Sequence, residues 1–260
     1  MDVYWFEQTQ SDAPSADNWL GVNEARFLSG LRFPNRRADW LLGRWTAKNA
    51  LAMCLGLSTE PQALREIEIR ASPSGAPEAF VRNQPAEVTL SLSHRAAVGA
   101  CAVVRSRVAM GCDLEWIEPR TDAFAADYFA PEEQALIANA TAEDRHALLA
   151  LLWSAKESTL KAVREGLRRD TRSVIVGFSG TPRIRGFPLN SSEQQPSFSD
   201  RSSSAANDWE HLHVRTTDGE VFYGWWTESD GLLRTLVAAP PPSPPILLSR
   251  QCFAAQGNEF

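Results

Sequence analysis

Long hydrophobic runs are missing from this sequence. The longest uninterrupted apolar stretch, residues 96–104, is far shorter than the roughly 20 residues that a membrane-spanning helix needs, and it is typical of a buried strand. The first residues, Met1 to Glu7, have neither the basic start nor the apolar segment of a secretory signal. We therefore expect a cytoplasmic protein with no membrane contact.

Cysteine and lysine are both scarce. The four cysteines include no C-x-x-C pair, so we expect buried thiols rather than a zinc site or a disulfide. Acidic residues outnumber basic ones by 32 to 26, which argues against a nucleic-acid-binding protein. Only three basic residues are lysines, namely Lys48, Lys156 and Lys161, and these positions are notable because lysine and arginine are not interchangeable at a phosphate site.

The hydrophobic pattern predicts both helices and strands. Helices are expected over residues 35–55, which Gly56 ends, and over 143–165, with a shorter helix that begins at Pro131. Strands are expected over residues 88–93, 98–104 and 108–117 as an antiparallel meander, over 172–178, and over 211–238 as two hairpins. Residues 179–207, rich in Ser, Pro and Gln, are expected to form a long surface loop.

This order of elements divides the chain into two α+β halves, residues 1–107 and 108–239. A Pro-rich tail, residues 240–260, is placed outside the fold. A short internal echo supports the division, because Trp45-Thr46-Ala47-Lys48 and Trp153-Ser154-Ala155-Lys156 stand 108 residues apart in the two long helices. Chance similarity in an alanine-rich chain is the other explanation of these four positions.

The run Gly111-Cys112-Asp113-Leu114-Glu115-Trp116 places two carboxylates on one face of a strand, because alternate side chains of a strand share a face. Asp113 and Glu115 then repel each other unless open water or a cation surrounds them. A half-exposed strand explains the pattern most simply. A Mg²⁺ ion, which is bound by a few carboxylates and by phosphate oxygens, is the alternative.

Two helical stretches carry charge in patterns with two interpretations each. Glu157 and Lys161 lie opposite the apolar face of the second long helix, either as the i,i+4 ion pair of a solvated helix or as part of a site. Arg37, Arg44 and Lys48 form one stripe of the first helix with no acid among them. They lie either in water or around a multiply charged anion such as a nucleotide phosphate.

Taken together, these segments resemble the 4′-phosphopantetheinyl transferases of the larger, surfactin-activator (Sfp) type. Residues 111–115 resemble the family's G-[VIC]-D-[LI]-E run, and residues 153–161 resemble its W-x-x-K-E-[AS]-x-x-K run. Leu90-Ser91-Leu92-Ser93-His94 is similar to its S-x-S-H strand end, residues 36–51 to its first helix, and residues 129–133 to the segment that opens its second half. The resemblance spans about residues 30 to 180.

The resemblance implies a pseudo-symmetric monomer in which each half is an antiparallel sheet packed against a long helix, with coenzyme A in the cleft between the halves. It implies that Asp113, Glu115 and Glu157 hold Mg²⁺, with Mn²⁺ possible, and that the metal links Asp113 to the coenzyme. Glu157 and Lys161 become the catalytic residues, as base and as charge balance. The implied coenzyme-binding residues are Arg36, Arg37, Arg44, Ser93, His94, Asp113, Lys156 and Lys161.

The activity that this resemblance implies is transfer of 4′-phosphopantetheine from coenzyme A to a serine of an acyl or peptidyl carrier protein, with release of 3′,5′-ADP. The partners would be carrier proteins or domains of fatty-acid, polyketide or nonribosomal-peptide synthases. A catalytically silent relative that binds coenzyme A or a carrier is the alternative. Gly75-Ala76-Pro77 departs from the family's Gly-Lys-Pro, and we expect Arg70 or Arg82 to replace the missing cation or the affinity for coenzyme A to be lower.

Overall fold

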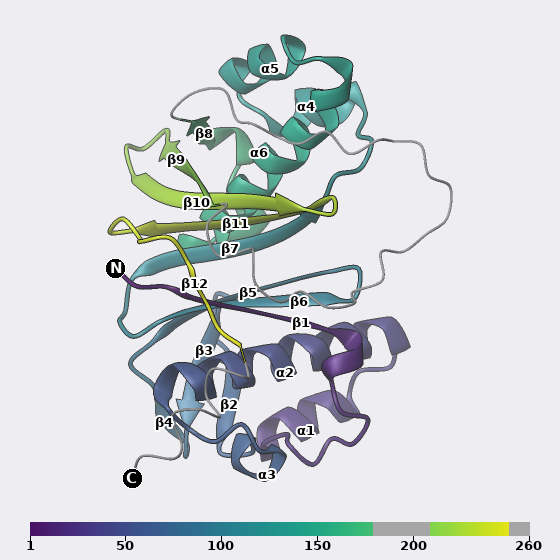
Figure 1. The fold of residues 1–260 in the computed structure, drawn as a ribbon, viewed down its shortest axis with the longest axis vertical. Coiled ribbons are helices and arrows are strands. Elements are labelled where there is room, and N and C mark those ends of the chain that lie inside the picture. The colour runs from purple at the N-terminus through teal and green to yellow at the C-terminus, as the bar shows by residue number, and fades with distance from the viewer. Residues whose placement is uncertain (179–208, 250–260) are drawn as a thin grey trace.

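The computed structural model describes residues 1–178 and 209–249 and arranges them in four layers, in the order helix, sheet, sheet, helix (Figure 1). The strand order is β12-β1-β6-β5 in the first sheet and β7-β11-β10-β9-β8 in the second. Neighbouring strands are antiparallel, except that β12 runs parallel to β1. The predicted α+β class is confirmed, and the predicted loop 179–207 lies outside the described residues.

The strands of the two large sheets come from both ends of the chain. In the first sheet they are β1 (Tyr4–Thr9), β5 (Thr89–Arg95), β6 (Val98–Val104) and β12 (Ile246–Leu247). In the second they are β7 (Ala109–Trp116), β8 (Val174–Phe178), β9 (Glu210–Thr216), β10 (Val221–Ser229) and β11 (Leu232–Ala239).

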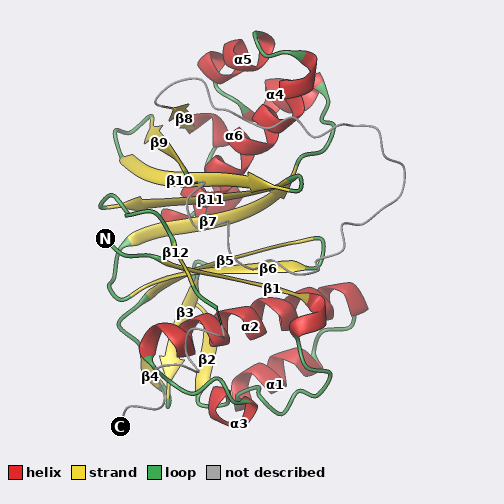
Figure 2. Ribbon diagram, viewed as in Figure 1, coloured by secondary structure: helices red, strands yellow, loops and turns green. Residues whose placement is uncertain are grey.

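One long helix covers the outer face of each sheet, as Figure 2 shows. On the first sheet this helix is α2 (Pro34–Leu55), which has proline at its first position and ends at Gly56 with a φ of +69°, a conformation that favours glycine. On the second sheet it is α6 (Ala142–Ala162), where the Thr141 hydroxyl accepts a hydrogen bond from the N–H of Asp144. The two predicted long helices are confirmed.

The inner faces of the two sheets pack against each other. Val98, Ala100, Ala102 and Val104 of β6 belong to a buried cluster that also contains Leu236 of β11. The alternate residues of β6 face α2 instead, so every residue of this strand is buried. Burial on both faces explains why the sequence of β6 is continuously apolar rather than alternating.

Smaller elements surround these layers. They are the helices α1 (Val22–Ser29), α3 (Pro61–Leu64), α4 (Asp122–Tyr128) and α5 (Pro131–Ala138), the 3-10 turns η1 (Gln10–Asp12), η2 (Gly166–Arg168) and η3 (Thr171–Ser173), and a small sheet of β2 (Ile67–Ala71), β3 (Pro77–Val81) and β4 (Gln84–Pro85). None of the helices in the described residues is long and apolar enough to cross a membrane.

Two expectations about chain arrangement were wrong. The predicted meander breaks after its second strand, because β7 pairs with β11 in the second sheet and not with β6. The beginning of the tail does not lie outside the fold, because Ile246 and Leu247 form β12 and pair with Tyr4 and Trp5 of β1. Residues 250–260 lie outside the described residues.

Candidate active site

Serine side chains join the two sheets where their edge strands β5 and β7 meet. The Ser91 hydroxyl accepts a hydrogen bond from the N–H of Cys112 at 2.9 Å. The Ser93 hydroxyl accepts one from the N–H of Leu114 at 3.1 Å and donates one to the Asp113 carboxylate at 2.8 Å. Ser93 therefore orients Asp113, rather than only offering its hydroxyl to a bound phosphate.

Gly111 allows α6 to cross β7 closely. A side chain at this position would overlap the backbone carbonyl of Ser158 on α6, so the close crossing requires glycine. The crossing brings Glu157 and Lys161 of α6 beside Asp113 of β7. The first residue of the Gly-Cys-Asp-Leu-Glu run therefore positions the charged residues that follow it.

Asp113 is the centre of a buried polar network. Its Oδ1 accepts a hydrogen bond from the Lys161 ammonium at 2.8 Å, and its Oδ2 accepts one from the Ser154 hydroxyl at 3.0 Å. Burial works against the charged form of Lys161, but Asp113, Cys112 and Glu157 together outweigh it, and the pKa of Lys161 is raised. One of the two interpretations of Lys161 was an i,i+4 ion pair with Glu157 on a solvated helix face. That interpretation was wrong, because the Lys161 ammonium pairs with Asp113 of β7 instead.

The other two carboxylates occupy less favourable surroundings. Glu115 is 6% exposed and forms ion pairs with Arg120 and, at 3.7 Å, with Arg95. Burial nevertheless raises its pKa to about 7. Burial, and secondly the charge of Asp113, also raise the pKa of Glu157, which is half-buried. Both groups therefore accept a proton or a cation more readily than an exposed glutamate.

The three carboxylates line one pocket, which we call the carboxylate pocket, with a volume of about 410 Å³. Its polar lining residues are Ser93, His94, Arg95, Asp113, Glu115, Arg120, Glu157 and Lys161. The structure thus brings together the predicted Ser93, His94, Asp113, Glu115, Glu157 and Lys161.

A second pocket adjoins the first and has an excess of positive charge, whereas the carboxylate pocket has three acidic and three basic side chains. This Arg44 pocket has a volume of about 360 Å³ and shares Leu92 and Lys161 with the carboxylate pocket. Its charged lining residues are Arg44, Lys161, Arg164, Glu165 and Arg168, and the turn 74–77 between β2 and β3 closes one side. The two pockets form one elongated site with a cationic end and a carboxylate end, and residues of both halves line it.

Arg44 is the predicted anion-binding residue that reaches the site. Its guanidinium lies 5.0 Å from the ring centroid of Trp40, and burial lowers its pKa. The Nε atom is buried and has no hydrogen-bond partner in the described part of the chain. A buried donor without a partner is costly, so a bound anion would be a favourable partner for Arg44.

The remaining predicted residues of the first half lie at or beyond the rim. Neither Arg36 nor Arg37 lines either pocket, and Arg37 donates a hydrogen bond to the backbone carbonyl of Leu28 at 3.1 Å. His94 lines the carboxylate pocket, is exposed, and lies 3.7 Å from Asp39 of α2. The structure therefore places Arg44 and His94 at the two pockets and places Arg36 and Arg37 at neither.

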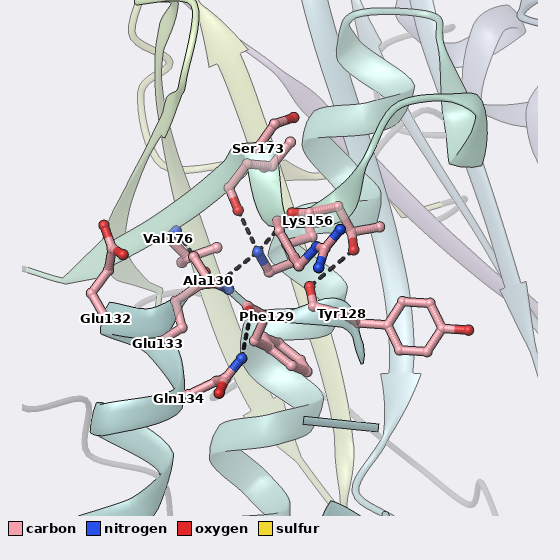
Figure 3. A network of polar contacts seen from close by, with 12 residues as sticks. Tyr128, Phe129, Ala130, Glu132, Glu133, Gln134, Lys156, Ser173 and Val176 are labelled. Atoms are coloured by element: carbon pink, nitrogen blue, oxygen red, sulfur yellow. Dashed lines mark hydrogen bonds and ion pairs between the residues drawn. The ribbon is translucent and has the colours of Figure 1, made fainter. Parts of the chain in front are cut away.

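Lys156 does not line the site, contrary to expectation. Its ammonium is fully buried on the far side of α6, where it forms an ion pair with Glu133 at 2.7 Å and donates to the backbone carbonyls of Thr171 and Val174 (Figure 3). Glu133 in turn accepts hydrogen bonds from the N–H groups of Ala130 and Val176. Lys156 is therefore a structural residue that fixes α5 and β8 against α6.

Lys48 has the same role in the first half. Its buried ammonium pairs with Glu24 and donates to the backbone carbonyl of Trp19. Glu24 also accepts hydrogen bonds from the N–H groups of Gly21 and Ile69. The repeated Trp-[Thr/Ser]-Ala-Lys motif therefore lies in two equivalent buried networks, one in each half. The expectation that Lys48 lies in water or on a bound anion was wrong.

The donor chemistry of the carboxylate pocket fits a divalent cation. In the described residues, no three His, Cys, Asp or Glu side chains are already close enough to hold a metal together. Lys161 contacts Asp113, and Arg120 contacts Glu115. Burial raises the pKa of Glu115 and of Glu157, which measures the cost of keeping these carboxylates charged. A Mg²⁺ ion would relieve that cost, and carboxylate oxygens are its usual protein ligands.

Helical projection placed Arg164 on the same face as Glu157 and Lys161, but sequence reasoning missed Arg168, a second cation that the second half brings to the Arg44 pocket. Arg164 and Arg168 line it, whereas the two expected substitutes for a lysine at position 76 do not. Arg70 pairs with Glu68 and Arg82 with Glu66, each at 2.7 Å. The signal for Arg168 was the presence of three arginines among residues 164–169, just after α6, but the sequence alone does not reveal where their side chains lie.

Comparisons with known proteins find similar sequences of one kind. A model of the 4′-phosphopantetheinyl transferase superfamily matches residues 109–221, which include β7 and α6. The 4′-phosphopantetheinyl transferase HetI of Nostoc sp. is 26% identical over 63% of this chain and 67% of its own length. The holo-[acyl-carrier-protein] synthase of Shouchella clausii is 38% identical over 27% of this chain and 62% of its own length.

A solved structure is also similar in part. The Helicobacter pylori holo-[acyl-carrier-protein] synthase, determined in complex with coenzyme A, is 18% identical and matches 39% of this chain and 97% of that chain with a TM-score of 0.26. The geometry defines a two-halved α+β protein with a site of mixed charge between its sheets. In sequence, residues 109–221 are similar to the 4′-phosphopantetheinyl transferase superfamily, and the relatives found are a 4′-phosphopantetheinyl transferase and a holo-[acyl-carrier-protein] synthase.

Proposed function

We propose that this protein transfers 4′-phosphopantetheine from coenzyme A to a serine of a carrier protein in a Mg²⁺-dependent reaction. The observation that carries the proposal is the joining of a cationic pocket and a carboxylate pocket at Lys161. Phosphoryl transfer needs cations around the phosphate groups and a proton acceptor near the attacking hydroxyl, and the two ends of the site offer these.

Each residue of the site has a role in this reaction. Arg44 binds phosphate oxygens at the cationic end. Lys161, whose raised pKa keeps it charged, balances the negative charge that develops on the transferred group. Asp113, Glu115 and Glu157 would hold Mg²⁺, which when bound neutralises phosphate oxygens as a Lewis acid.

Glu157 is the residue best suited to accept the proton. The serine oxygen of the carrier forms a bond to the β-phosphorus of coenzyme A, the bond from that phosphorus to the bridging oxygen breaks, and 3′,5′-ADP leaves. The serine proton passes to a carboxylate, and burial together with Asp113 raises the pKa of Glu157 toward the range that general-base catalysis requires.

The test is the intact mass of apo carrier proteins after incubation with this protein, coenzyme A and Mg²⁺. We expect a mass gain of one phosphopantetheine, and we expect Glu157→Gln to slow it by about 10²- to 10⁴-fold, the usual contribution of a general base. Thermal unfolding of the variant checks that it is folded. A protein that binds coenzyme A but modifies no carrier would be a silent relative, and the proposed transfer would be wrong.

A further inference from the structure

The second half of the molecule brings two arginines to the cationic pocket. Arg164 follows the last turn of α6, and Arg168 lies in η2 directly after it. Both line the Arg44 pocket, although α6 belongs to the second sheet and Arg44 comes from α2 on the first. The charge of this pocket therefore comes from both halves.

Arg164 has a backbone conformation that normally selects glycine. Its φ is +60°, and the turn is closed by a hydrogen bond from the N–H of Glu165 to the carbonyl of Leu160. The equivalent position at the end of α2 is Gly56, with a φ of +69° and the matching bond from Leu57 to Ala52. The first half thus ends its helix with the preferred residue, whereas the second half keeps an arginine at a steric cost.

Arg168 spans the opening between the halves. Both terminal nitrogens of its guanidinium lie 3.4 Å from the backbone carbonyl of Ser74, in the turn that closes the pocket on the first half. One of them also donates to the carbonyl of Arg164 at 3.0 Å. These acceptors are neutral, so the charge of Arg168 is not balanced by a carboxylate in any of these contacts.

The charge balance of the pocket points to an anion. Arg44, Lys161, Arg164 and Arg168 line it against one acidic residue, Glu165. Lys161 is paired with Asp113, and the ion pair of Arg164 with Glu78 is long, at 3.8 Å. The buried Nε of Arg44 has no partner in the described residues. Guanidinium groups arranged in this way match phosphate oxygens.

We propose that Arg164 and Arg168 bind the phosphate groups of the 3′,5′-ADP part of coenzyme A, opposite Arg44. This inference rests on the proposed function for the identity of the ligand. 3′,5′-ADP carries two of the three phosphates of coenzyme A, and its binding can be measured without a carrier protein and without transfer. Through these two arginines, the second half of the molecule then contributes directly to the affinity for coenzyme A.

The test is calorimetric titration of 3′,5′-ADP without Mg²⁺ into the wild type, Arg168→Ala, Arg168→Lys and Arg164→Gly. We expect the dissociation constant to rise about tenfold for Arg168→Ala and for Arg164→Gly, as for loss of a charge-assisted hydrogen bond, and less for Arg168→Lys. Arg164→Gly should unfold at a temperature no lower than the wild type, because glycine adopts its backbone conformation freely. A loss of affinity without loss of stability separates binding from a structural role.

Arg82→Ala is the matched control, because Arg82 is an exposed arginine that pairs with Glu66 outside the pocket. It should bind 3′,5′-ADP like the wild type. Unchanged affinity in both Arg168→Ala and Arg164→Gly, or no binding by the wild type, would overturn the inference. A wild type that binds 3′,5′-ADP through these arginines yet modifies no carrier would leave the inference intact and refute the proposed transfer.

Discussion

Glu115 is a buried carboxyl group whose charged form is disfavoured by burial. The side chain is 6% exposed, and its pKa is raised from 4.5 to about 7 despite the nearby Arg95 and Arg120. Alternation along the strand predicted that Asp113 and Glu115 share a face, and both line the carboxylate pocket. The pattern did not predict the depth of burial, because the partner that covers the strand, α6, comes from a segment some 40 residues away.

This pKa has a consequence for stability without metal. Because the folded state binds the proton of Glu115 more tightly than the unfolded state does, its stabilising effect is fully present below pH 4.5 and is lost as the pH rises through about 7. Relative to the non-titrating variant Glu115→Gln, the free energy of unfolding of the wild type should fall by roughly 3 kcal/mol between pH 4.5 and 8.

Urea unfolding of both proteins in a chelator, at several pH values, measures this difference. Using the difference between the two proteins removes the contributions of all other titrating groups, which both share. A difference that does not change across this pH range would show that the Arg95 and Arg120 contacts already hold Glu115 ionised.

The two buried lysines are best understood at the scale of elements. In each half, one lysine in the middle of the long helix pairs with a glutamate at the start of a short helix, and that glutamate also accepts the N–H of a strand residue. Helical periodicity alone predicted the long helices well. It did not predict that these two lysines are buried. A lysine is buried only where an acidic partner compensates its charge, and the partners Glu24 and Glu133 lie in other elements that helical periodicity does not reveal.

Removing either lysine should therefore destabilise its half. Lys156→Met leaves the Glu133 carboxylate buried without its cation and should lower the free energy of unfolding by roughly 3 to 5 kcal/mol. Lys48→Met should have a similar effect through Glu24. Adding Glu133→Gln to Lys156→Met should recover part of the loss, because the buried charge is then removed.

Urea denaturation of the single and double variants gives these energies. Lys156→Met should also keep its affinity for 3′,5′-ADP under native conditions, because Lys156 lines neither pocket. If Lys156→Met instead loses affinity while its stability is unchanged, the original assignment of this lysine to the coenzyme site would be restored.

At the scale of the whole molecule, contacts between the halves hold the site together. The hydroxyls of Ser91 and Ser93 join the sheets at the site, and on another part of the interface Arg234 of β11 forms an ion pair with Glu7 of β1. The order of elements along the sequence predicted two halves. The boundary after residue 107 also placed β7 in the second half, but the strand pattern predicted that β7 pairs with β6 in a meander, because local strand patterns do not specify which strands pair over long distances.

The C-terminal segment is a third connection, and it links the last strand of the second sheet to the first strand of the first. The N–H groups of Ser243, Ile246 and Leu248 donate to the carbonyls of Met1, Val3 and Trp5, at 2.8 to 2.9 Å. The Trp225 indole donates to the carbonyl of Pro242 at 3.0 Å. This segment also covers part of the free edge of β1.

A chain that ends at Ala239 should consequently be less stable by roughly 2 to 6 kcal/mol, because it loses at least these four hydrogen bonds, of about 0.5 to 1.5 kcal/mol each. A chain that ends at Ser249 keeps all four and is the control. Because the segment contacts neither pocket, the shorter chain should bind 3′,5′-ADP as well as the control at a temperature where both are folded. Equal unfolding free energies for the two chains would mean that the serine and Arg234 contacts alone fix the halves, whereas a loss of affinity in the folded shorter chain would mean that the segment also sets the width of the site.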